Sequence, residues 1–76
     1  MLQTETAHIG EWTVHIAEIT ERMSRNRYAV FFRAEIHRNN KIVEITQRRS
    51  SRSQATRDGE LRAMRLRLLE RAEVGA

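Results

Sequence analysis

Arginine is the residue type best placed to do chemistry in this chain of 76 residues, and it gathers in the last third. The run RRSSRSQATRDGELRAMRLRLLERA, residues 48–72, holds eight arginines and three acidic residues. A planar guanidinium group stays charged at any working pH and binds phosphate through two parallel hydrogen bonds. Backbone N–H groups at the start of a helix also favour phosphate. The cluster at the expected strand-to-helix junction therefore predicts a phosphate-binding site made by Arg48, Arg49, Arg52 and Arg57.

The charge distribution supports a polyanionic partner. Residues 1–47 hold six basic and six acidic residues, whereas residues 48–76 hold eight arginines against four acids, so the formal net charge of +4 lies entirely in the second part. Such asymmetry favours nucleic acid as the ligand. Thirteen of the fourteen basic residues are arginine, which is also what a GC-rich genome would produce.

A second interpretation treats the arginine run as the solvated face of a helix. Pairs at helical spacing, Arg57 with Glu60 and Arg67 with Glu70, would then absorb part of the charge. On this interpretation the chain is a protein-interaction or homodimerisation module without a nucleic-acid role. A third interpretation places the basic, leucine-containing helix on anionic lipid, but that helix lacks Trp and Phe, so we expect no membrane partner.

Catalytic and metal-binding patterns are absent from the sequence. Cysteine is missing, and His8, His15 and His37 have no spacing typical of a zinc site. The chain has no nucleophile elbow and no glycine-rich phosphate loop. Glu35 and Glu44 are expected to face each other on the outer sheet surface, solvated beside basic residues. The sequence predicts a non-enzymatic protein with no cofactor, no metal and no small-molecule substrate.

The order of elements predicts an α+β fold in which a three-stranded antiparallel sheet packs against one C-terminal helix. Apolar and polar residues alternate in residues 11–19 and 28–37, which is typical of half-buried strands. A third strand is expected at 41–48, a loop at 21–27 in which Met23 folds back over the core edge, and a helix at 54–73. Residues 1–10 are expected to form a loose N-terminal arm, and residues 11–74 a single small α+β domain. The first ten residues do not resemble a signal peptide, so we expect a cytoplasmic protein.

A two-residue turn at Asn39-Asn40 is predicted to join the last two strands, because asparagine tolerates a positive φ. This turn would place Val43 and Ile45 on the core face of the sheet. The expected pairs are Arg38 with Lys41, Ile36 with Val43, Ala34 with Ile45, and Phe32 with Gln47.

The expected helix has more apolar residues than one sheet can cover. Ser53, Thr56 and Asp58 are possible N-caps, and Gly59 is expected to weaken the first turn. A stripe at helical spacing is expected to cover the sheet: Leu61, Met64, Leu68 and Ala72. A small chain without disulfides often gains stability from a second subunit. We therefore expect a homodimer formed through the surplus apolar residues, which are Leu66, Leu69, Phe31 and Ile42.

Over residues 28–72 the order of elements resembles the β-β-β-α core of double-stranded RNA-binding domains. The resemblance implies phosphate binding at the start of the last helix. The family's SKKxA motif has no counterpart here, where SRSQA and TRDGE are the nearest stretches, and the family's leading helix is also missing. DNA readers of the plant and integrase-arm types also combine three strands with a helix. These likenesses concern architecture, which does not determine function.

Overall fold

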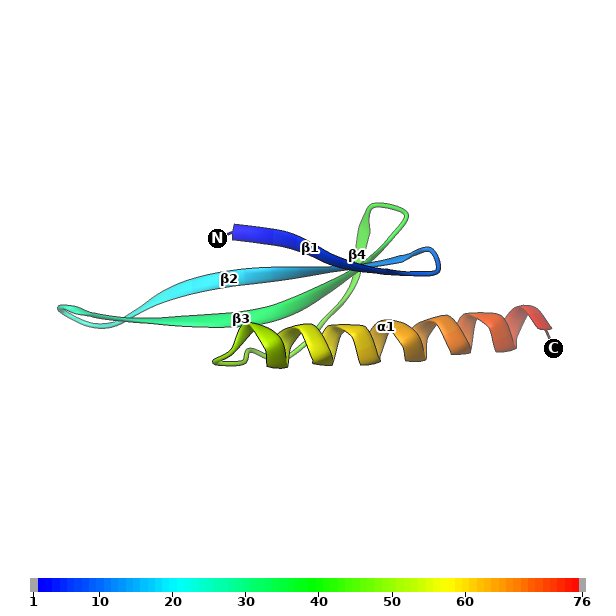
Figure 1. Cartoon of the computed structure of the whole chain (residues 1–76). Coiled ribbons are helices and arrows are strands. Elements are labelled where there is room, and N and C mark those ends of the chain that lie inside the picture. The colour runs from blue at the N-terminus through cyan, green and yellow to red at the C-terminus, as the bar shows by residue number, and fades with distance from the viewer. Residues whose placement is uncertain (1, 76) are drawn as a thin grey trace.

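The protein folds into one antiparallel sheet covered on one face by a single C-terminal helix (Figure 1). The structure, a computed structural model, describes residues 2–75, and describes side chains for residues 7–73. The α+β class and the sheet-plus-helix architecture are confirmed, but the sheet has four strands rather than three, in the order β1-β2-β3-β4. The elements are β1 (Leu2–Ile9), β2 (Trp12–Ser24), β3 (Arg27–Arg38), β4 (Lys41–Ile45) and α1 (Arg52–Gly75).

The additional strand, β1, lies within the segment predicted to be a loose arm. Gly10 has a positive φ of 62°, which lets the chain reverse so that Ile9 pairs with Trp12. The register shifts between Glu5 and Ala7, where a β-bulge inserts an extra residue. A bulge interrupts the alternation of side chains along a strand, and this explains why the sequence shows no period in this segment. Met1, at the start of the predicted arm, lies outside the described residues.

The hairpin of β2 and β3 is longer than the sequence suggests. Its ladder runs from Trp12–Arg38 to Ser24–Arg27, so most of the predicted loop at 21–27 belongs to the strands. Met23 does not fold back over the core, since it is 60% exposed. The polar composition of this end reflects two strands that face solvent on both sides, and it does not reflect a loop.

The turn between β3 and β4 is confirmed, but the predicted register is wrong beyond its second pair. Asn39 and Asn40 have φ values of 55° and 63°, as the two-residue turn requires, and Arg38 pairs with Lys41. A shift after the next pair then places Glu44, rather than Val43, opposite Ile36. The shift turns the apolar residues away from the core, where Val43 is 52% and Ile45 is 47% exposed. Phe32 consequently pairs with Arg49 instead of Gln47.

The helix covers the sheet with its smallest residues. Ala55 and Ala63 are fully buried, and Gly59 lies between them on the same face. A Cβ atom built on Gly59 would lie 2.5 Å from Cβ of Ala34 and 2.7 Å from Cγ1 of Val14, so the helix backbone sits directly on the central strands. The core consists of Trp12, Val14, Ile16, Ala34, Ile36, Ala55 and Ala63. The predicted covering stripe is wrong, because Leu61, Met64 and Leu68 are 56%, 50% and 65% exposed and Ala72 is exposed.

Polar contacts cap the start of the helix and fix its end on the sheet. At the start, Ser51 Oγ accepts a hydrogen bond from the N–H of Gln54 at 3.2 Å, so Ser51 is the N-cap instead of the three predicted residues. Near the end, the Arg38 guanidinium donates two hydrogen bonds to Glu70, at 3.0 and 3.2 Å. Glu70 is therefore bound to the sheet rather than to Arg67.

The molecule is elongated, with principal extents of 55 × 20 × 15 Å. The β2–β3 hairpin extends beyond the start of α1 at one end, and α1 continues in the opposite direction (Figure 1). Within the described residues, no helix combines the length and the apolar composition that crossing a membrane requires.

Candidate nucleic-acid interface

The projecting end of the β2–β3 hairpin is a two-stranded ribbon. Pairing with β1 stops at Glu18, and the last bridge from the chain after β4 reaches Phe32. Among the residues that the structure describes, residues 19–31 therefore pair only with each other, and we call this segment the ribbon. Because α1 begins beside Phe32 and runs away from the tip, neither face of the ribbon is covered by the helix (Figure 1).

Three arginines lie around the tip of the ribbon, and all three are exposed. Arg22 donates hydrogen bonds to the carbonyl oxygens of Ser24 and Arg25, at 3.4 and 3.2 Å, so it braces the turn while keeping its charge. Arg25 and Arg27 form no ion pair with any described carboxylate. The tip is thus positively charged, without an acidic partner among the described residues.

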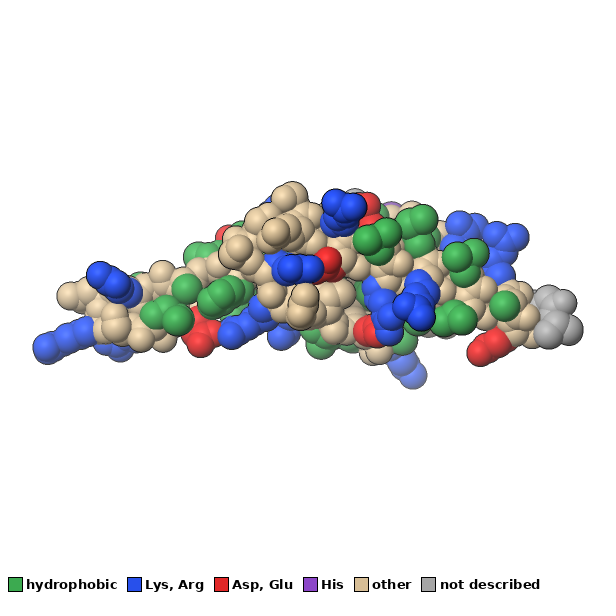
Figure 2. All heavy atoms as spheres, turned by 90° about the horizontal axis from the view of Figure 1, so that it is seen from below, with side chains coloured by type: hydrophobic (Ala, Val, Ile, Leu, Met, Phe, Trp, Pro, Cys, Tyr) green, Lys and Arg blue, Asp and Glu red, His purple; other side chains and the backbone are tan. Residues whose placement is uncertain are grey.

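Exposed apolar side chains accompany these charges. Tyr28 is 64%, Met23 is 60% and Val30 is 43% exposed. Tyr28 and Val30 share one face of β3 with Phe32, because alternate residues of a strand point to the same side. Figure 2 shows basic and hydrophobic side chains together at the ribbon end of the molecule, on the left.

Two arginines of the predicted junction site extend this surface on opposite faces of the sheet. The Arg48 guanidinium lies 4.5 Å from the ring centroid of Phe31, and that of Arg52 lies 5.3 Å from the ring centroid of Phe32. Phe31 and Phe32 are consecutive in β3, so they face opposite ways. Arg48 also pairs with Glu21, whereas Arg52 has no described carboxylate partner.

The other two predicted arginines are separated from this surface. Arg49 donates two hydrogen bonds to Asp58, at 2.7 and 3.3 Å, and these bonds raise the pKa of Arg49 above its ordinary value. This pair ties the chain after β4 to the helix. Arg57 is exposed on α1 and forms no ion pair with a described residue, so the predicted partner Glu60 does not bind it. The structure therefore does not bring the four predicted arginines together in one phosphate-binding site.

The residues predicted to form a dimer contact are also dispersed. Leu66 is half-buried and packs against the core, so it is occupied within the subunit. Leu69 is 55% exposed on α1, and Ile42 is 50% exposed on the edge strand β4. Phe31 lies half-buried under Arg48. These four side chains do not form one continuous patch on a single element.

The outer sheet face carries a cluster of histidines beside a buried carboxylate. The rings of His15 and His37 lie 4.0 Å apart, between centroids. Burial, followed by the nearby His15, lowers the pKa of His37 below its ordinary value, although Glu35 opposes the shift. Glu35 is 1% exposed and accepts two hydrogen bonds from Arg33, at 3.3 and 3.1 Å. Among the side chains that the structure describes, no three acidic, histidine or cysteine residues are grouped as metal ligands would be.

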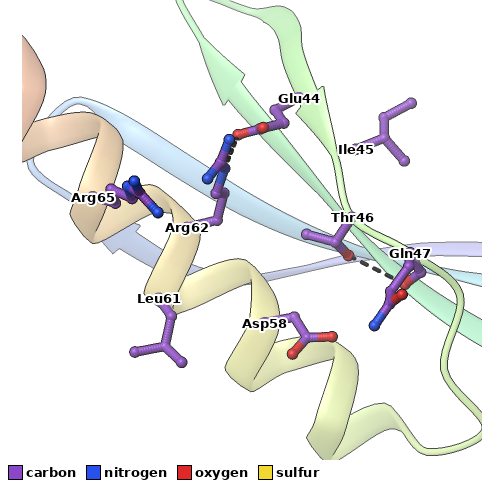
Figure 3. A pocket seen from close by; sticks show the side chains of 8 residues that line it. All are labelled: Glu44, Ile45, Thr46, Gln47, Asp58, Leu61, Arg62 and Arg65. Carbon is purple, nitrogen blue, oxygen red and sulfur yellow. Dashed lines mark hydrogen bonds and ion pairs between the residues drawn. The ribbon is translucent and has the colours of Figure 1, made fainter.

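The expected pairing of Glu35 with Glu44 is wrong, because the shift in β4 places them on opposite sides of the sheet. Glu35 pairs with Ile45 in the ladder, while Glu44 points to the helix and binds Arg62. This hydrogen bond, supported by the charges of Arg62 and Arg65, lowers the pKa of Glu44 below its ordinary value. Figure 3 shows the ion pair across an open groove of about 530 Å³ between β4 and α1. The paired charges make this groove a structural contact between sheet and helix.

Comparison with protein-family models, with curated proteins and with solved structures finds no match for this chain. Its function is therefore argued from the chemistry of its own surface.

Proposed function

We propose that this protein is a non-enzymatic module that binds nucleic acid through the ribbon. The observation that carries the proposal is that Arg22, Arg25 and Arg27 have no acidic partner among the described residues. Arg22 also pairs across the two strands with Tyr28, whose side chain is exposed. Elsewhere in the sheet the arginines are paired with carboxylates: Arg33 binds Glu35, and Arg38 binds Glu70. Guanidinium groups at one end of the molecule whose charge no described carboxylate neutralises are available to phosphates.

The shape of the ribbon suits a nucleic acid. A two-stranded ribbon fits the major groove of B-form DNA, where guanidinium groups reach phosphates and base edges. An exposed tyrosine provides a flat surface on which an unpaired base stacks. Arg52 lies over Phe32, on the same face as Tyr28, and so continues the cationic surface towards the start of α1. The binding surface we propose comprises Arg22, Arg25, Arg27, Tyr28 and Arg52.

This surface shares only Arg52 with the four-arginine site expected from the sequence. We leave Arg49 out because Asp58 occupies its guanidinium group, and Arg48 because Glu21 neutralises it. Arg57 contributes only general positive charge from the exposed side of the helix.

The salt dependence of binding tests the proposal. Each neutralised phosphate contributes a log–log slope of about −0.9 on B-DNA, so four arginines give roughly −3 to −4. Changing Arg25 and Arg27 to alanine should reduce the slope by about two units and leave the fold intact, since both side chains are exposed. Fluorescence anisotropy with labelled duplex and single-stranded DNA and RNA measures the slope for each ligand.

A matched double variant provides the control. Arg65→Ala with Arg67→Ala removes the same charge from exposed positions of α1, far from the ribbon. This control should bind nearly as tightly as the wild type. Equal losses in the two double variants would mean diffuse attraction and would contradict a ribbon site, as would the absence of binding at physiological salt.

The stacking role of Tyr28 predicts a difference between ligands. Loss of one base–aromatic stack costs about 1–3 kcal/mol, so Tyr28→Ala should weaken binding to single strands by roughly 5–150-fold. Tyr28→Phe should keep most of the affinity because the ring remains. An equal effect of Tyr28→Ala on duplex and single strand would assign Tyr28 a contact other than stacking.

A further inference from the structure

The outward face of α1 carries a row of large apolar side chains that remain exposed in the single subunit. Leu61, Met64 and Leu68 are each at least half exposed, whereas the helix residues that the sheet covers fully are Ala55, Gly59 and Ala63. They follow a spacing of three and four residues, the pattern of a coiled-coil seam. Figure 2 shows hydrophobic side chains in green among the basic ones along the helix half of the molecule. We call these three residues the outer seam.

We propose that the outer seam binds the outer seam of a second copy of this chain, with the two α1 helices antiparallel. The two-fold symmetry decides which residues face each other. The two helices run in opposite directions, so the numbers of two facing residues always add up to the same value. When Met64 faces Leu68 of the second copy, Leu68 faces Met64, so both apolar contacts form at once. The symmetry axis then crosses the helix pair near the level of residue 66.

The charges beside the seam support this register. With Met64 facing Leu68 the sum is 132, so Arg71 of one copy lies one residue, about 1.5 Å along the helix axis, from the level of Glu60 of the other, and the symmetry makes this contact twice. Neither side chain forms an ion pair within its own subunit among the described residues, so both are available. Arg65, on the opposite flank, lies close enough to Glu44 of its own chain to influence that carboxylate. A parallel arrangement would instead place Glu60 beside Glu60 and Arg71 beside Arg71, which like charges oppose.

The energetics also favour a second copy. The core of one subunit contains three alanines among its seven residues, and a chain of this size buries a smaller share of its surface than a larger domain does. Burying a leucine or methionine side chain fully contributes about 1.5–3 kcal/mol relative to exposure. Met64 and Leu68 in each of two copies therefore supply a hydrophobic contact that the isolated subunit lacks, while Leu61 lies against the methylene groups of Arg71 of the other copy.

This assembly is independent of the proposed function and adds a geometric consequence to it. The ribbon extends beyond the start of α1, so antiparallel helices place the two ribbons at opposite ends of the dimer (Figure 1). The dimer would present two separate surfaces of the same kind.

The oligomeric state tests the proposal without any nucleic acid. Sedimentation at micromolar concentration should show a dimer, and Met64→Glu with Leu68→Glu should give a folded monomer, because both side chains are at least half exposed. Met23→Glu, at an equally exposed residue of the ribbon, should remain dimeric. A wild-type protein that is monomeric up to millimolar concentration would overturn the proposal, and so would a Met64→Glu, Leu68→Glu protein that still dimerises.

Charge exchange and cross-linking test the antiparallel register. Glu60→Arg alone should weaken the dimer, and Glu60→Arg with Arg71→Glu in one chain should restore it, because the pairs re-form with opposite sign. The chain has no cysteine, so Met64→Cys and Leu68→Cys introduce unique thiols. Mixing these two variants under oxidation should give mainly the mixed disulfide. Preferential cross-linking of each variant with itself would contradict the antiparallel pairing.

Discussion

Replacement of Gly59 by alanine should destabilise this protein, although the same change stabilises most helices. An added methyl group would lie 2.5 Å from Cβ of Ala34 and 2.7 Å from Cγ1 of Val14, whereas carbon atoms prefer about 3.5–4.0 Å. The helix would have to move away by about 1 Å. Overpacking of this kind costs about 1–3 kcal/mol, and alanine regains about 1 kcal/mol of helix propensity. Because both contacts are below 3.0 Å, we expect a net loss of about 1–2 kcal/mol.

Thermal and urea unfolding at one fixed protein concentration measure this loss. Each kcal/mol lowers Tm by roughly 4–8 °C for a domain of this size. A second substitution isolates the contact: in an Ala34→Gly background only the contact with Cγ1 of Val14 remains, so Gly59→Ala should cost less stability than it does in the wild type. A gain of about 1 kcal/mol from Gly59→Ala in the wild-type background would refute the reasoning, because it would mean that another face of α1 covers the sheet.

Two further predictions concern a histidine and the turn. The pKa of His37 is lowered by burial and by His15, so the folded protein disfavours protonation of this residue. The stability that His37 contributes should therefore be present above its ordinary pKa, and it should be lost as the pH falls through the lowered pKa of the folded protein. NMR titration of the imidazole should show the low pKa, and His37→Gln should make stability less sensitive to acid. Asn40 has a φ of 63°, so Asn40→Gly should be neutral or stabilising in urea unfolding, whereas Asn40→Val should cost about 1–2 kcal/mol. Equal stability of the glycine and valine variants would contradict the left-handed conformation.

The sequence predicts the fold class because its strongest signals are local. The alternation in β3 and the Asn39-Asn40 turn depend on neighbouring residues, and both appear in the structure. The strand β1 was not predictable from alternation, since its bulge breaks the period. The register of β4 failed for the same reason, because a shift beside Val43 moves the following side chains to the other face.

The covering face of the helix illustrates a different difficulty. Hydrophobic spacing points to Leu61, Met64 and Leu68, and it cannot show that Ala55, Gly59 and Ala63 allow a closer approach to the sheet. The sequence does carry a signal for the covering face, which is a small residue at every fourth position of the helix. Recognising it would require knowing that Val14 and Ala34 lie opposite, which is tertiary information.

The candidate site depends on long-range pairing in the same way. Arginines that are close in sequence predict a phosphate-binding site at the junction between strand and helix. In the structure, however, Arg49 is paired with Asp58 and Arg48 with Glu21. The arginines of the ribbon become the leading surface only when β2 and β3 are seen to project beyond the helix. Their exposure follows from the length of a hairpin that the polar composition of residues 21–27 concealed.

The most direct test of the central claim is an NMR titration of the isotopically labelled protein with a short oligonucleotide at physiological salt. The proposed surface predicts that amide shifts concentrate in residues 22–30 and around Arg52, while the second half of α1 stays unchanged. Shifts concentrated at Arg65, Arg67 and Arg71, or spread evenly over all arginines, would contradict binding by the ribbon.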